Sequence, residues 1–505
     1  MKRIDRAVLF GSLLVEDDLA RRSIRGGMIT LTSQATQFIL RMLGMVILVR
    51  ILSPADYGLV AMAMVVLNFV QLFKDAGLAT ATVQRESISR EQISTLFWMN
   101  VMIGALLAVL VLLSAPLLSM FFGRPELTKV TAAFSISILV TGLAVQHEAL
   151  LRRHMRFNAL AFIQIVSLAI GLVVSVVVAV LGFRYWALVA GAITQAVAWT
   201  LLIFYFCPWL PGKMTKGAGV RGMLRFGGHL TGFHLVNYFA RNADNILIGK
   251  FIGTVALGLY SRAYQLLMLP LNQIRAPLDQ VALPALSSLR TAPERYARFF
   301  QRLLEIYIHI MMPLTLLCAL EADFLVRLLL GPQWIGTVAV FRILAIAGLI
   351  QAISTTRGLV MISFGFSRRY FYWGLFNSIL MVASFAAGLP FGIEGVALAY
   401  TIANYVILVP SLLYCFRGTP VTVAMFLRTF YPPLLAAMPS LAAVMLARHF
   451  WPSRSLLVHG LYSCLFIASF VLLSWRRRSV RETIGLVLAG LRPEPEGKMG
   501  CGVDG

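Results

Sequence analysis

Charged residues are scarce in this sequence of 505 residues: they make up 13% of it, whereas hydrophobic residues make up 59%. The mean hydropathy is +0.82. No soluble globular class approaches this composition, and the apolar runs recur along the whole chain. The composition therefore excludes an ordinary soluble enzyme and predicts an all-α polytopic membrane protein.

Acidic residues are few beside the basic ones, 21 against 44, which gives a formal net charge of +23. In a soluble chain this excess would indicate a nucleic-acid or acidic partner. Here the basic residues gather in alternate loops between apolar runs, and no basic helix is interleaved with stacking aromatics. We therefore expect contact with membrane lipid and no nucleic-acid partner.

The sequence has five cysteines, an odd number, which are widely spaced and lie mostly in or beside apolar runs. They are Cys207, Cys318, Cys415, Cys464 and Cys501. This pattern predicts neither a disulfide framework nor a metal site.

The common catalytic motifs are also missing. The sequence contains no P-loop, no His-Glu-x-x-His and no Asp-x-Asp, which removes the usual support for an ATP-driven pump, a zinc protease or a metal-dependent sugar transferase. A Gly-x-Gly-x-x-Gly pattern occurs at 217–222, but it follows a proline-rich break and precedes an apolar run. We interpret it as a flexible linker rather than a nucleotide site. The chain is expected to be neither an enzyme nor dependent on a cofactor.

What the sequence has in abundance is apolar runs long enough to span a bilayer, which takes about 20 residues. They predict about fourteen transmembrane helices. Six precede a polar break: 26–49, 57–77, 94–120, 128–147, 159–181 and 185–206. Eight follow it: 223–249, 255–285, 299–321, 335–364, 370–388, 394–416, 422–447 and 455–475.

Lysine and arginine concentrate at the termini and in the loops after even-numbered helices, for example Arg152, Arg153 and Arg156. By the positive-inside rule both termini lie in the cytoplasm, and an even number of helices agrees. The start of the chain reads as a cytoplasmic leader, with an uncleaved signal as the alternative.

An internal repeat aligns 48–59 with 248–259 at an offset of 200 residues. The register pairs Arg50 with Lys250, Gly58 with Gly258 and Arg41 with Arg241. A second match joins the runs from 182 and 392. The repeat predicts two pseudo-symmetric six-helix lobes. Transporters built from such lobes carry the substrate between them and alternate access by rocking one lobe against the other.

The predicted organisation follows from these boundaries. It is a cytoplasmic leader at 1–25, an N-lobe at 26–206, a cytoplasmic linker at 207–222, a C-lobe at 223–416, two further helices within 417–475 and a basic cytoplasmic tail at 476–505.

Polar side chains form one stripe on each of two matched helices, at helical spacing. The stripes are Gln34, Gln37 and Arg41, and Asn237, Arg241 and Asp244. Ionisable groups at membrane depth normally face a bundle interior or a watery cavity. We predict that Arg41, Arg241 and Arg262 make a cationic cavity suited to phosphate, which guanidinium binds bidentately. The alternative is that each arginine bonds carbonyls or a carboxylate as a structural element.

Asp244 is the best candidate for binding a coupling ion, a proton or sodium, although it could instead form a structural pair with Arg241 at i,i+3. Pairs near helix ends, such as His147 with Glu148, are interpreted as solvated. Arg275 and Asp279 have the i,i+4 spacing of an ion pair.

Two stretches carry a family resemblance, 33–78 with its Ser-Pro-Ala-Asp-Tyr-Gly-Leu loop and 240–274 with its Ile-Leu-Ile-Gly-Lys-Phe-Ile-Gly run. They resemble the bacterial polysaccharide exporters of the multidrug/oligosaccharidyl-lipid/polysaccharide flippase superfamily, in the branch that serves colanic acid and succinoglycan. The resemblance covers about residues 25 to 475.

The resemblance implies a flippase of the bacterial inner membrane that moves an undecaprenyl-pyrophosphate-linked repeat unit for exopolysaccharide or lipopolysaccharide biosynthesis. Ion coupling and contact with the polymerase or export machinery are implied with it. Related lipid-precursor flippases use cavity arginines, and Arg41, Arg241 and Arg262 match that role by type and depth.

Three alternatives remain open. A drug/cation antiporter of the same superfamily would favour acidic cavity groups. A membrane glycosyltransferase or polymerase acting on the same lipid carrier would need a large extracytoplasmic loop, and the odd-numbered loops here are short. A purely structural scaffold would leave the matched arginines without a purpose.

Overall fold

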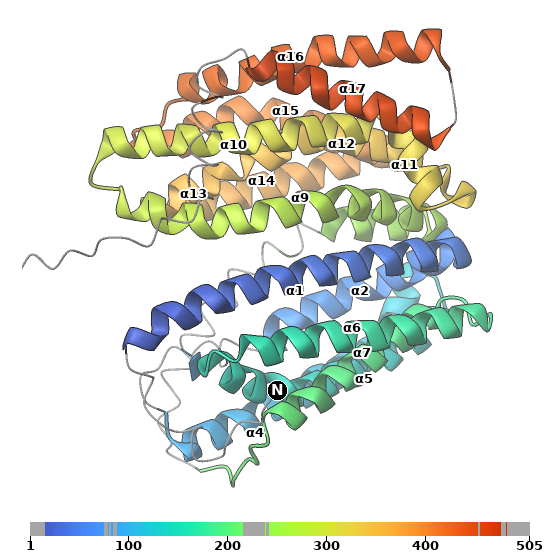
Figure 1. Ribbon diagram of the computed structural model, residues 1–505. Coiled ribbons are helices and arrows are strands. Elements are labelled where there is room, and N and C mark those ends of the chain that lie inside the picture. The colour runs from blue at the N-terminus through green and yellow to red at the C-terminus, as the bar shows by residue number, and fades with distance from the viewer. Residues whose placement is uncertain are drawn as a thin grey trace, which may run out of the picture. The chain divides into compact units, whose positions relative to one another are not determined.

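The computed structural model is helical throughout the part of the chain that it describes, with no strand among those residues (Figure 1). The described residues are 16–74, 79, 82, 83, 88–215, 238, 242–452, 455–475 and 481.

Long helices account for the first six expected spans. They are α1 (Glu16–Ile51), α2 (Pro54–Lys74), α4 (Arg90–Phe122), α5 (Glu126–Arg153), α6 (Phe157–Val180) and α7 (Trp186–Phe206). Local sequence sets the ends of α4. The Ser89 hydroxyl accepts from the Gln92 N–H and the Gln92 side chain accepts from the Ser89 N–H, while Gly123 closes the helix in the left-handed conformation.

The later helices begin with a helical segment at 242–251. It is followed by α9 (Thr254–Ser288), α10 (Pro293–Leu320), α11 (Ala322–Leu329), α12 (Thr337–Ser354), α13 (Thr356–Ser363), α14 (Ser367–Gly388), α15 (Gly392–Phe416), α16 (Val423–Phe450) and α17 (Leu456–Trp475). Two 3-10 turns, Pro332–Trp334 and Leu389–Phe391, lie between helices.

Eleven stretches of the described residues are long and apolar enough to cross a membrane. One of them, Ser367–Phe416, contains both α14 and α15. The helix α9 is not among them, because three prolines and several charged residues interrupt its apolar run. The all-α polytopic architecture expected from composition is confirmed, while most of the expected helix at 223–249 lies outside the described residues.

Two expected boundaries were wrong. The first helix begins at Glu16, ten residues before position 26. The single helix expected at 335–364 is two, α12 and α13, divided at Thr355. At the break Thr356 Oγ1 donates to the Ile353 carbonyl and Arg357 Nε donates to the Ser354 carbonyl, so side chains engage the carbonyls at the end of α12.

The chain packs as two compact units. The first comprises 1–266, 325–343 and 372–403, and the second comprises 267–324, 344–371 and 404–505. The division into two six-helix lobes stays a prediction from the repeat.

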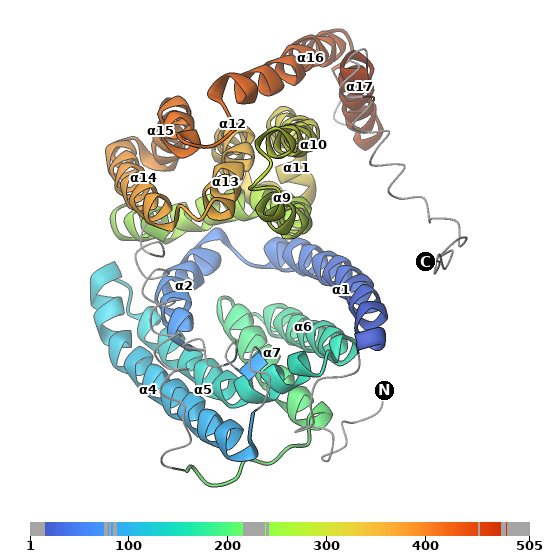
Figure 2. The ribbon, with the colours of Figure 1, turned by 90° about the vertical axis from the view of Figure 1, so that its left-hand side faces the viewer.

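In the first unit, α1, α6, α7, α5 and α2 form a row in which each helix packs on the next. The helix α4 lies against α5 and α2. Figure 2 views these helices nearly end-on. Close approach depends on small residues: a Cβ on Gly191 of α7 would lie 2.7 Å from the Gly171 carbonyl oxygen of α6. Likewise a Cβ on Gly44 of α1 would lie 2.6 Å from Leu172 of α6.

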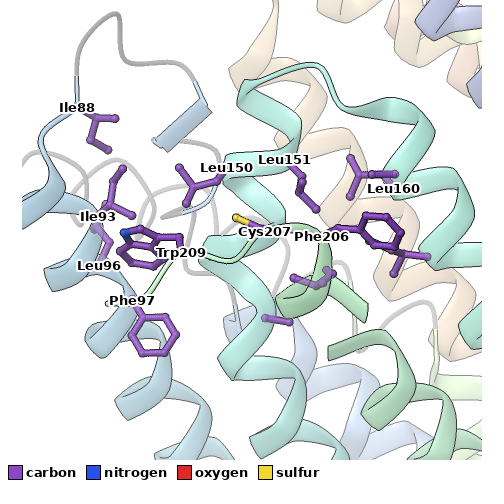
Figure 3. Packing of buried hydrophobic residues seen from close by; sticks show 14 residues of the cluster. Ile88, Ile93, Leu96, Phe97, Leu150, Leu151, Leu160, Phe206, Cys207 and Trp209 are labelled. Carbon is purple, nitrogen blue, oxygen red and sulfur yellow. The ribbon is translucent and has the colours of Figure 1, made fainter. Parts of the chain in front are cut away.

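An apolar cluster joins α4, α5, α6, the end of α7 and the segment that follows it (Figure 3). Cys207 and Trp209 are buried in it, and burial raises the pKa of the Cys207 thiol to about 12. His147 is fully buried beside this cluster, with a ring nitrogen 3.0 Å from the Trp209 carbonyl oxygen and its ring against Phe204. The interpretation of His147 as part of a solvated pair was therefore wrong.

In the second unit, α10, α16 and α17 pack together around Val444, Tyr462 and Phe466. Glu321, which follows α10, is 2% exposed. Arg448 of α16 and His459 of α17 both bind its carboxylate, with the His459 Nδ1 to Oε2 distance 2.7 Å. A buried carboxylate thus ties three helices together.

The pair expected in α9 is confirmed. Arg275 Nε lies 3.1 Å from Asp279 Oδ2, and the Tyr307 hydroxyl of α10 donates to Asp279 Oδ1 at 2.5 Å.

Candidate substrate site

A polar cavity of about 410 Å³ opens within the first unit, lined by all five helices of the row α1, α6, α7, α5 and α2. The lining residues are Gln37, Arg41, Met64, Leu67, Gln71, Phe134, Ser137, Thr141, Glu148, Gln164, Ser167, Leu168, Ala192, Gln195, Ala196 and Trp199. The volume lies within the range of small-molecule sites.

The predicted stripe on α1 contributes two of its three members. Gln37 and Arg41 line the cavity, whereas Gln34 is half-buried and is not among the lining residues. Gln37 Nε2 donates to Gln164 Oε1 of α6 at 2.8 Å and to Ser33 Oγ at 3.1 Å. The amide of Gln37 is therefore held by α6 across the α1–α6 contact.

Among the described residues that line the cavity, Arg41 and Glu148 are charged, and Glu148 is paired with Arg152. Glu148 Oε1 accepts from Arg152 Nε at 3.1 Å and from Arg152 Nη2 at 2.7 Å, one turn along α5. Arg41 has no hydrogen bond or ion pair with any residue that the structure describes. An uncompensated guanidinium at membrane depth requires water or an anion, since an unpaired charge in hydrocarbon is costly.

Arg262 is placed elsewhere. Its guanidinium carbon lies 4.3 Å from the centroid of the Tyr57 ring, and its buried Nε has no hydrogen-bond partner among the described residues. It is not among the residues that line the cavity. Its participation in substrate binding stays a prediction.

Asp244 is 6% exposed. Its Oδ1 accepts from the Asn245 backbone N–H at 2.7 Å, and the buried Tyr260 side chain lies beside the carboxylate. Asn237 and Arg241 lie outside the described residues. The pairing of Arg241 with Asp244, and the matched placement of Arg41 and Arg241, therefore stay predictions.

Residues matched by the repeat take matched places in the first unit. A Cβ on Gly58 of α2 would lie 1.7 Å from the Thr254 carbonyl oxygen of α9, and one on Gly258 would lie 1.9 Å from the Pro54 carbonyl oxygen. The two helices therefore meet backbone to backbone at this glycine pair.

The matched basic residues behave alike as well. Arg50 Nη2 donates to the Leu328 carbonyl at 2.6 Å, near the end of α11. Lys250 Nζ donates to the Phe121 carbonyl near the end of α4. Each cation thus binds the negative end of another helix.

Several cavity residues were missed by the sequence argument. Gln164 and Gln195 are polar residues inside the apolar runs 159–181 and 185–206, a signal that could have identified them. Gln71 and Glu148 stand near helix ends, where a polar residue is ordinary, so sequence gives no comparable signal for them.

The helices and their polar cavity define the chain as a multi-pass membrane protein with a transporter fold. The fold is similar to that of the lipid II flippase MurJ in an inward closed conformation, with a TM-score of 0.70 at 15% identity over 90% of this chain and 99% of that chain. It is also similar to an inward-facing multidrug resistance MATE family transporter, with a TM-score of 0.61 at 14% identity over 75% and 94%.

Residues 47–339, more than half of the chain, match the model of a family described as polysaccharide biosynthesis protein, and the chain belongs to that family. It is 29% identical to the teichuronic acid biosynthesis protein TuaB of Bacillus subtilis over 60% of this chain and 64% of that one, less than two thirds of TuaB. It is 25% identical to the succinoglycan biosynthesis transport protein ExoT of Rhizobium meliloti over 83% of this chain and 85% of that one. The resemblance to polysaccharide exporters is confirmed.

Proposed function

We propose that this protein is a flippase that moves undecaprenyl-pyrophosphate-linked oligosaccharide repeat units from the inner to the outer leaflet of the bacterial inner membrane. The product would serve exopolysaccharide or lipopolysaccharide biosynthesis. Family membership and the MurJ-like fold support the proposal. The observation that carries it is Arg41, which lines a polar cavity between apolar helices and has no ion-pair partner among the described residues.

The physical task fits such a cavity. A pyrophosphate-linked sugar cannot cross hydrocarbon unaided, because its charges and hydroxyls would lose their hydrogen bonds to water. Arg41 would bind a phosphate of the headgroup, while the polyprenyl tail stays in lipid. Arg241 and Arg262 are proposed to add positive charge in other states of an alternating-access cycle.

Net transport requires a difference in free energy between the two sides. We assign Asp244 as the binding site of a coupling proton or sodium ion, since it is a buried carboxylate that accepts from the Asn245 backbone N–H and lies beside the Tyr260 side chain. The concentration of basic residues at the termini and in alternate loops supports a cytoplasmic position for both termini. A polymerase or export complex would take up the product on the outer side.

A drug/cation antiporter is the competing function, because multidrug transporters share the fold. The observation in its favour is Glu148 in the cavity. Its carboxylate is paired with Arg152, however, so an organic cation would meet the charge of Arg41, which has no ion-pair partner among the described residues.

The test is complementation of a flippase-deficient polysaccharide producer at matched expression. Surface polymer and lipid-linked intermediates are measured for the wild type and for Arg41→Ala, Arg41→Lys and Arg241→Ala. Arg124→Ala, in the loop after α4, is the matched control. We expect polymer with the wild type and the control, and inner-leaflet intermediates with Arg41→Ala.

Arg41→Lys should restore export only in part, because an ammonium lacks the bidentate fork. Failure of the wild type to restore polymer, together with resistance to cationic drugs, would support the antiporter instead.

A further inference from the structure

Four glutamine carboxamides line the cavity. Gln37, Gln71, Gln164 and Gln195 come from four different helices, α1, α2, α6 and α7, and all four line it. An uncharged amide in a membrane costs free energy unless it is hydrogen-bonded. Four of them converging on one space indicate a polar occupant.

The glutamine side chains satisfy only part of their hydrogen-bonding capacity through one another. Gln37 and Gln164 form one hydrogen bond of 2.8 Å. Gln71 and Gln195 make no side-chain hydrogen bond to any other described residue, and both face the same cavity. Their donors and acceptors remain for a ligand or for water.

The chemistry of the lining selects among polar ligands. A carboxamide both donates and accepts, and a sugar hydroxyl does the same, so amides can bind hydroxyls whatever their orientation. Trp199 adds an aromatic surface suited to the apolar C–H face of a pyranose ring. Because Glu148 is paired with Arg152, Arg41 is the lining charge that has no ion-pair partner among the described residues.

The position of the cavity also fits a substrate that enters from the cytoplasmic side. Gln71 and Glu148 lie near the ends of α2 and α5, which the charge distribution places at the cytoplasmic surface. A sugar newly attached to its carrier lies in that leaflet under the proposed function.

We propose that this amide-lined cavity is the saccharide subsite, in which Gln71, Gln164 and Gln195 bind the hydroxyls of an uncharged sugar while Arg41 binds the phosphate next to it. The inference rests on the proposed function and adds the part of the substrate that each residue contacts. Arg41 would determine the affinity for the pyrophosphate carrier lipid, and the three glutamines would determine the preference for a sugar.

The experiment measures binding to the full-length protein in nanodiscs. The probes are a polyprenyl pyrophosphate without sugar and the same lipid carrying glucose, galactose or N-acetylglucosamine. The variants are Gln71→Leu, Gln195→Leu and Arg41→Ala, and Gln301→Leu, an exposed position of α10 outside the cavity, is the control.

For the wild type and the control we expect at least one sugar to tighten binding about tenfold, since each neutral hydrogen bond is worth roughly a factor of five. Gln71→Leu and Gln195→Leu should reduce that increment while keeping the affinity for the sugarless lipid, which also shows that they fold. Arg41→Ala should weaken all probes by a similar factor.

Two outcomes overturn the proposal separately. If the wild type binds the sugarless lipid and no sugar tightens binding, or if the increment survives in both glutamine variants, the subsite is wrong and the flippase function stands. If the wild type binds none of the pyrophosphate lipids, the proposed function fails and the subsite fails with it.

Discussion

The contact of Gly58 with Gly258 allows a quantitative prediction. A Cβ on Gly258 would lie 1.9 Å from the Pro54 carbonyl oxygen, and one on Gly58 would lie 1.7 Å from the Thr254 carbonyl oxygen, whereas real Cβ atoms essentially never come within 3.0 Å of another atom. Because the obstacles are backbone atoms, no rotamer change relieves the clash. The helices α2 and α9 must separate by about 1 Å for either methyl group to fit.

Such overpacking costs about 1–3 kcal/mol at ordinary core positions. Alanine in place of glycine returns at most about 1 kcal/mol through helix propensity. We therefore expect Gly58→Ala and Gly258→Ala each to lower the free energy of unfolding by about 2 kcal/mol. Since one separation of the helices relieves both clashes, the double variant should lose about as much as either single variant.

The assay is reversible unfolding of the purified protein in dodecylmaltoside with increasing sodium dodecyl sulfate. The controls are Gly374→Ala in α14 and Gly460→Ala in α17, where a Cβ meets nothing within 4 Å. Both should be neutral or slightly stabilising. Equal stability of all four single variants would refute the backbone contact, and full additivity in the double variant would refute a shared separation.

Three further predictions follow from other parts of the molecule. Asp244→Asn should abolish the dependence of transport on pH or sodium in proteoliposomes, and an unchanged ion dependence would remove Asp244 as the coupling site. Glu321→Gln should destabilise the second unit by about 3 kcal/mol, because Arg448 loses a buried partner; the double variant Glu321→Gln with Arg448→Leu should recover part of this loss in the same unfolding assay. In a cysteine-free background, Arg124→Cys should react with an impermeant maleimide added to intact spheroplasts and Lys213→Cys only after permeabilisation, as the charge distribution predicts; the reverse labelling would invert the topology.

Sequence alone determined the helical membrane class of this protein. Spanning a bilayer needs a run of about 20 apolar residues, a local property that can be read directly. The repeat also determined which residues correspond, and Gly58 with Gly258 and Arg50 with Lys250 occupy matched places. Arg41 was found because a charge inside an apolar run is conspicuous.

Only the tertiary structure decided which side chains meet. Gln71 and Gln195 are 124 positions apart in the chain, yet they line one cavity because α2, α5 and α7 pack in a row. The same packing buries His147, which its place near a helix end suggested was solvated. Hydropathy indicates whether a segment prefers lipid to water, and it can be read from the segment alone. A cavity depends on which faces several helices turn toward one another. Those orientations are set by contacts between residues far apart in the sequence.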